Sequence, residues 1–261
     1  MLAAVLNGDA KKLAEMIRHN PGFNANLPNG NRWTPLHYAC DRSRASALIP
    51  LLLAHPDIDV NLKNSGGYTP FYFACGSGQL SCVREMLKDS RVKVNEPADN
   101  GGTPLWVATA NNRIDVIKWW IASGIEINLG KPGDVDKTDS IGVAKMYGKT
   151  EVATLLERFK ENPVETRHAV RLELGWCDEA AAEVFALAVF VSDGLLQIKD
   201  TTTTTPAARF FSIATQLPLE LQMVLCYRVV GSPKEIIQGK DSEAAFKSLA
   251  ERLIWCSLFT N

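Results

Sequence analysis

The amino-acid sequence predicts an all-α fold, in which a solenoid of helix-turn-helix repeats is followed by a helical C-terminal domain. A Thr-Pro hexapeptide recurs as TPLHYA, TPFYFA and TPLWVA, beginning at Thr34, Thr69 and Thr103. A pair of an aliphatic residue and an asparagine keeps step with it, at Val60–Asn61, Val94–Asn95 and Ile127–Asn128. Because two separate markers recur in phase, we interpret them as internal repeats.

Each repeat is expected to begin with a helix at its Thr-Pro pair. The threonine side chain can accept a hydrogen bond from a free amide of the first turn, and proline fits the first helical position. A fourth copy, DSIGVA at Asp139, lacks this helix-starting pair. The glycine pairs Gly66–Gly67 and Gly101–Gly102 predict sharp turns that can require a positive φ. A second helix follows in each unit at a short apolar run: Leu51–Leu53, Met86–Leu87, Trp120–Ile121 and Leu155–Leu156.

These motifs resemble the ankyrin repeat over about residues 1–162. The match consists of a truncated first copy, three full or nearly full copies and the degenerate last one. The resemblance implies pairs of antiparallel helices, each with a projecting β-hairpin finger, stacked into a curved solenoid. The repeat signal stops after Pro163, so residues 163–261 are expected to form the separate helical domain.

The stretch TPLHYAC places His37 three residues before Cys40, a spacing that suits two metal ligands or a nucleophile and its base. In the family that the chain resembles, this histidine supports the loop between repeats through hydrogen bonds. The residues equivalent to it, Tyr72 and Trp106, cannot bind a metal. We therefore expect structural roles for His37 and Cys40, and no catalytic, metal-binding or cofactor-binding site.

The composition excludes several classes of function. The net charge of −1 argues against a general nucleic-acid binder, which needs an excess of Lys and Arg. The longest apolar run, Val184 to Val191, is too short to span a bilayer, and the N-terminus lacks the pattern of a signal peptide. Six scattered cysteines contain no CxxC pair and are interpreted as reduced thiols, which favours a cytoplasmic or nuclear protein.

The resemblance implies a non-catalytic module that binds a protein partner of unknown identity on its fingers and inner helices. Trp33 and Tyr68 both precede a helix-starting threonine, so they can form a binding hot spot or pack against neighbouring fingers. Carried over position by position, the family's binding face corresponds to Asn31, Trp33, Asp41, Arg42, Ser65, Tyr68, Ser77, Asn100, Ala110 and Asn111.

Helix-starting signals continue in the C-terminal domain. Helices are expected to begin near Asp178, Pro206, Pro218 and Asp241. The tract Thr201–Thr205 between them is low in complexity and is predicted to be a mobile loop, with phosphorylation as the alternative.

The segment from Leu217 to Val229 resembles the first helix of an F-box, a module that docks a substrate adaptor onto a ubiquitin ligase. The alternative is a helix of the domain's own core. Because Met223 and Val224 make the helix hydrophobic nearly all round, we expect Leu221 and Leu225 to be buried. The residues that fit the F-box pattern are Leu217, Pro218, Glu220, Leu221, Leu225 and Val229.

Overall fold

The computed structural model describes residues 2–20, 22, 24–42, 47–130, 138–192, 210, 213–214, 216–230, 237, 241–242, 244–245 and 247–248. These residues are mostly helical and include no strand. The chain divides into two compact units, Met1–Val170 and Arg171–Asn261. The domain boundary expected after residue 162 stays a prediction, and the predicted loop Thr201–Thr205 lies outside the described residues.

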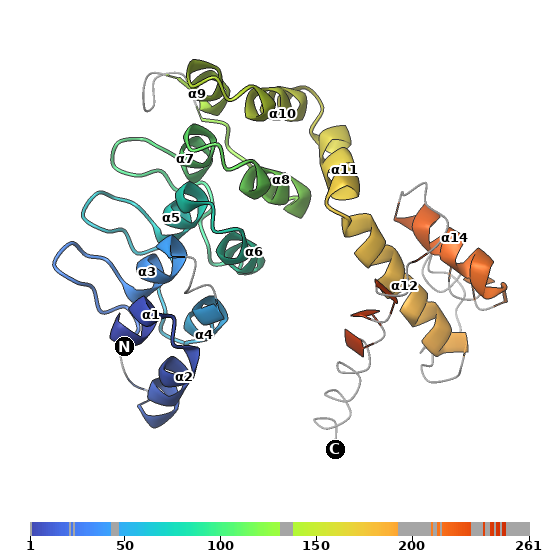
Figure 1. Ribbon diagram of the computed structural model, residues 1–261, viewed down its shortest axis with the longest axis horizontal. Helices are drawn as coiled ribbons and strands as arrows, with labels where there is room; N and C mark the ends of the chain where they lie inside the picture. The colour runs from blue at the N-terminus through green and yellow to red at the C-terminus, as the bar shows by residue number, and fades with distance from the viewer. Residues whose placement is uncertain are drawn as a thin grey trace. The chain divides into compact units, whose positions relative to one another are not determined.

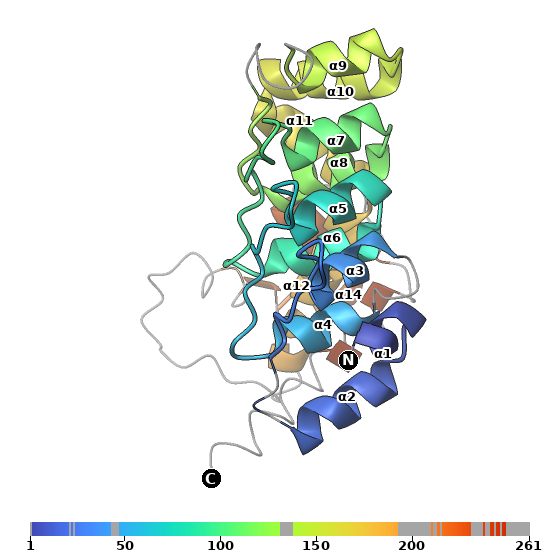
Figure 2. The same ribbon diagram turned by 90° about the vertical axis from the view of Figure 1, so that its left-hand side faces the viewer.

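The first unit is built from successive helix pairs (Figure 1). The first helices of the pairs pack on one another in chain order and form a row that we call the inner row. The second helices form an outer row beside it, and Figure 2 shows the inner row stacked in sequence order. The pairs are α1 (Leu2–Asn7) with α2 (Ala10–His19), α3 (Pro35–Asp41) with α4 (Ile49–Leu53), α5 (Pro70–Ser77) with α6 (Leu80–Lys88), α7 (Pro104–Ala110) with α8 (Ile114–Ser123), and α9 (Ser140–Met146) with α10 (Thr150–Glu161).

Threonine side-chain caps start α3, α5 and α7 as predicted. The hydroxyl oxygens of Thr69 and Thr103 accept backbone N–H bonds of 3.2 and 3.1 Å at the first turns of α5 and α7. In the degenerate fourth copy, Asp139 accepts the N–H of Gly142 at 2.7 Å. Aspartate is as good an N-cap as threonine, so α9 forms without the Thr-Pro pair.

The recurring asparagines join each repeat to the next one. The amide group of Asn61 donates to the carbonyl oxygen of Arg91 at 2.8 Å and accepts the N–H of Lys93 at 2.8 Å. Asn95 forms the same pair of bonds with Glu126 and Asn128, at 3.0 Å each. An amide side chain can donate and accept at once, which explains why this marker keeps step with the helix starts.

The loops before α3, α5 and α7, which we call the fingers, project on the side of the inner row (Figure 1). They comprise residues 24–33, 59–68 and 93–102, and their described residues form turns without strands. The second residue before each capping threonine has a positive φ: 58° at Arg32, 74° at Gly67 and 85° at Gly101. Only one glycine of each predicted pair therefore has this conformation.

Helix α11 (Pro163–Glu173) follows the last repeat. Its Arg167 Nε donates to the carbonyl oxygen of Ile121, at the end of α8, at 3.2 Å. This bond ties the beginning of α11 to the outer row. None of the described helices is long and apolar enough to cross a membrane.

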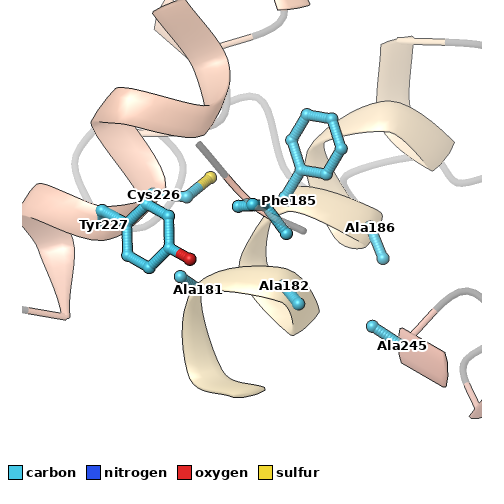
Figure 3. Close-up of a cluster of buried hydrophobic side chains, with 8 residues drawn as sticks. Ala181, Ala182, Phe185, Ala186, Cys226, Tyr227 and Ala245 are labelled. Atoms are coloured by element: carbon cyan, nitrogen blue, oxygen red, sulfur yellow. The ribbon is translucent and has the colours of Figure 1, made fainter. Parts of the chain in front are cut away.

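The second unit contains α12 (Trp176–Ser192) and α14 (Leu219–Val229), which pack against each other. In Figure 3, Phe185 and three alanines of α12 lie beside Cys226 and Tyr227 of α14. Helix α12 begins two residues before the predicted start, whereas α14 begins directly after Pro218, as predicted. Near the other predicted starts, the described residues 210, 213–214, 241–242, 244–245 and 247–248 are helical.

The prediction that Leu221 is buried is wrong. Leu221 is 52% exposed, and Leu225 is half-buried. The buried side of α14 instead carries Gln222, Cys226 and Tyr227. Since the facing side of α12 is rich in alanine, the side of α14 with the small Cys226 can approach it closely. A helix that is hydrophobic nearly all round does not reveal from its sequence which side faces the core.

Candidate partner-binding surface

His37 connects the first helix-starting threonine with the second finger. Its Nδ1 accepts the N–H of Thr34 at 3.1 Å, so the ring proton lies on Nε2 and is donated to the carbonyl oxygen of Tyr68 at 3.0 Å. Burial lowers the pKa of His37 to about 4. The neutral ring therefore acts as a bridge between repeats, in agreement with the structural role expected for it.

The cysteines near His37 are packed into the interior. Cys40 Sγ donates to Met86 Sδ at 3.4 Å, and Cys82 Sγ donates to the carbonyl oxygen of Ala39 at 3.5 Å. Burial raises the pKa of the Cys40 and Cys75 thiols well above their ordinary value. Because the thiolate is the reactive form, these groups are poor nucleophiles. Within the described ranges, no group of three or more His, Cys, Asp or Glu residues is placed to hold a metal.

A cluster of aromatic rings, half-buried except for the buried Tyr72, lies where the first two fingers meet α3 and α5. The Trp33 ring centroid is 5.0 Å from that of Tyr38 and 4.4 Å from that of Phe73. The Tyr68 centroid is 4.7 Å from that of Tyr72 and 5.8 Å from that of Phe73. Trp33 and Tyr68 are thus joined through Phe73. Both rings pack against neighbours and both keep an exposed part, so the two interpretations of these residues are compatible.

Phe73 was missed by the sequence-based prediction. It lies four residues after Thr69 and is equivalent to Tyr38 and Val107 in the neighbouring repeats. Two aromatic residues at one repeat position were the signal that could have identified it.

Most of the predicted polar residues bond to a neighbouring repeat. The Ser77 hydroxyl donates to Asp41 Oδ1 at 2.9 Å, and Asn100 Nδ2 donates to the Tyr68 hydroxyl at 3.3 Å. Asn111 Nδ2 donates to the Gly76 carbonyl oxygen at 2.9 Å. The remaining predicted residues are Asn31, whose carbonyl oxygen accepts the N–H of Ser65 at 3.1 Å, the exposed Arg42 and the half-buried Ala110.

A cleft of about 340 Å³ lies between α5 and α7 beside the aromatic cluster. Arg113 stands at its edge and donates from Nε to the Gly76 carbonyl oxygen at 3.0 Å. Its lining consists of Tyr72, Phe73, Gly76, Ser77, Val107, Asn111 and Arg113. A larger hollow of about 400 Å³ involves the outer row, but it contains none of the predicted binding residues.

Two exposed apolar residues extend the predicted face to the fourth repeat. Met146 and Tyr147 follow the N-cap Asp139 by seven and eight residues, the positions that Asp41 and Arg42 occupy after Thr34. They are 58% and 50% exposed. The sequence-based prediction stopped at the third repeat, and the same alignment continued by one copy would have found them.

The residues of the F-box-like segment lie in the second unit. Leu217 is half-buried, Pro218 is exposed and Val229 is exposed, in addition to Leu221 and Leu225 described above. Glu220 lies on α14, and its side chain is outside the described set. Leu221, Leu225 and Val229 follow one another at intervals of four residues, which places them along adjacent turns of the helix.

A family model for ankyrin repeats matches three copies in this chain, over residues 1–96 and 43–131. The two matches together cover half of the sequence and contain the fingers, the aromatic cluster and the cleft. They end before α14, so the F-box resemblance stays a prediction. The chain belongs to the ankyrin-repeat family.

Proposed function

We propose that this chain is a non-catalytic interaction module, and that a protein partner binds the face formed by the fingers and the inner row. Ankyrin repeats are general protein-interaction modules. The observation that supports the proposed face most directly is the aromatic cluster, in which the partly exposed rings of Trp33 and Tyr68 belong to the first two fingers. Aromatic anchors contribute much of the binding energy of interfaces, since they bury a large area at a low entropic cost.

Other features agree with a protein partner rather than a nucleic acid or a membrane. The net charge of −1 offers no general attraction to phosphates, and the neutral His37 and the buried thiols are poorly suited to catalysis. The described cysteines Cys40, Cys75, Cys82, Cys177 and Cys226 are free and buried, which supports a location in the cytoplasm or nucleus, where thiols stay reduced.

Replacing both Trp33 and Tyr68 by alanine is expected to weaken binding to a partner captured from native lysate. The loss should be about 2 kcal/mol, roughly thirtyfold in Kd, because both rings would supply exposed contact area. The measurement is a titration of the identified partner with the purified full chain.

A matched control is Trp119→Ala. Trp119 is a half-buried aromatic residue of the outer row, where the guanidinium of Arg84 lies 4.0 Å from its ring centroid. This variant should bind the partner as the unchanged chain does. Equal binding by the double variant, with its helical content intact, would show that the partner uses another surface.

A second function is favoured by the exposure of α14. We propose as the alternative that the chain is a substrate adaptor, which presents the bound partner to a ubiquitin ligase through residues 217–229. Docking requires apolar side chains that are available to the ligase subunit, and Leu221 and Val229 are 52% and 56% exposed. These two side chains are therefore not buried in the core of their own unit and remain available for a partner.

Replacing Leu221 by glutamate tests this alternative. Because Leu221 is on the exposed side of α14, the variant should keep the second unit folded, as judged by circular dichroism. Cys226→Glu is the matched control and should unfold the unit, since Cys226 is fully buried and an unpaired carboxylate there is costly. If the folded Leu221→Glu variant binds a cullin-ligase adaptor subunit as well as the unchanged chain does, the adaptor role is wrong.

A further inference from the structure

The cleft between α5 and α7 has an uneven distribution of charge. Arg113 is its only charged lining residue among those described, and it is exposed. Its Nε is occupied by the Gly76 carbonyl oxygen, which fixes the guanidinium in place, and it forms no ion pair within the described part of the chain. The hydroxyl of the lining residue Ser77 donates to Asp41 Oδ1 at 2.9 Å, so this carboxylate already has a hydrogen-bond partner.

At Gly76 the cleft lining contains a close contact between α5 and α7. Gly76 has no side chain, and a Cβ at this position would come within 3.0 Å of Val107 Cγ2. Phe73 and Val107 form apolar walls, whereas Asn111 uses its Nδ2 for the Gly76 carbonyl oxygen. A volume of about 340 Å³ is near the lower limit for small-molecule sites, roughly 300 Å³, and suits one large side chain better than a cofactor.

Resting on the proposed function, we propose that this cleft determines which partners bind: it takes one large apolar side chain of the partner, next to a carboxylate that pairs with Arg113. The apolar side chain lies between Phe73 and Val107, and the carboxylate meets the free N–H groups of the guanidinium. A guanidinium held in position loses little freedom when it binds a carboxylate, which favours this pairing.

The test uses the purified full chain and a phage-displayed library of random peptides. Peptides for this face are identified as those that the partner displaces, or that fail to bind the double variant Trp33→Ala, Tyr68→Ala. Their sequences should be enriched in an apolar residue beside Asp or Glu. Alanine in place of that apolar residue, or a neutral amide in place of the acid, should each weaken the synthetic peptide about tenfold.

Charge reversal provides the decisive comparison. Arg113→Glu should weaken the acidic peptide more than about tenfold, and a peptide with lysine in place of its acid should regain binding to this variant. Misfolding of the variant cannot produce that restored binding. The matched control is Arg158→Glu, which reverses an exposed charge on α10 and should leave the acidic peptide bound.

The outcomes separate this inference from the function on which it rests. Peptides that need the aromatic cluster but show no acidic preference, or that ignore Arg113→Glu, overturn the inference and leave the proposed face intact. Peptides that depend on neither Arg113 nor the aromatic cluster contradict both. A selection that yields no peptide for this face also overturns the inference, because a cleft of this chemistry should retain short peptides.

Discussion

Gly67→Ala is expected to destabilise the first unit by about 3 kcal/mol, through strain in the finger and a clash with the next finger. Gly67 has a φ of 74°, which residues with a Cβ rarely adopt. An added Cβ would collide with the carboxylate of Asp99 and lie 2.5 Å from the backbone nitrogen of the same residue. Because backbone atoms cannot rotate away, the third finger would have to shift. The free energy of unfolding in urea measures the effect.

Two other glycines separate the causes of this loss. Gly148 has a φ of 65°, and a Cβ added there would meet no atom within 4 Å, so Gly148→Ala should lose only about 1 kcal/mol, from strain alone. Gly30 has open space and no positive φ, so Gly30→Ala should change stability by less than about 0.5 kcal/mol. If Gly67→Ala and Gly148→Ala were equally destabilising, the contact between the second and third fingers would not contribute to stability.

Much of the first unit could be predicted because its signals are local and repeated. The Thr-Pro pairs start α3, α5 and α7, and each acts within one turn of helix. The interlocking asparagines were also visible as a marker, although their bonds to the next repeat were not. The cap of α9 was missed because Asp139 satisfies the same backbone amide with a different side chain.

The binding surface was less predictable, because it depends on contacts between repeats. The alignment identified Trp33 and Tyr68, but not Phe73, which joins their rings across two repeats. Arg113 lies outside the helix-starting motif, and only the stacking of α7 on α5 brings it to Gly76. In the second unit, the side of α14 that faces α12 depends on small side chains of another helix, which the pattern of α14 alone cannot reveal.

Acid is expected to destabilise the first unit through His37. The pKa of this histidine is about 4 in the folded chain, against its ordinary value of 6.5. Between these two pH values the unfolded chain binds a proton at this position and the folded chain does not. The contribution of the neutral His37 to the free energy of unfolding is therefore fully present above about pH 6.5. It is lost as the pH drops toward 4, by about 3 kcal/mol in total. Urea unfolding at a series of pH values measures this loss.

His37→Gln isolates the contribution of this residue from that of other titrating groups. The rings close to His37 are those of Trp33 and Phe73, with centroids at 5.8 and 6.0 Å, and they do not titrate. Glutamine carries no titratable group, so the variant should be less stable at neutral pH but lose about 3 kcal/mol less on acidification than the unchanged chain. Parallel pH profiles for the two proteins would show that His37 is not held neutral by burial. A smaller loss of stability on acidification for His37→Gln would instead show that protonation of His37 breaks the hydrogen-bonded bridge from Thr34 to Tyr68, which connects the first two full repeats.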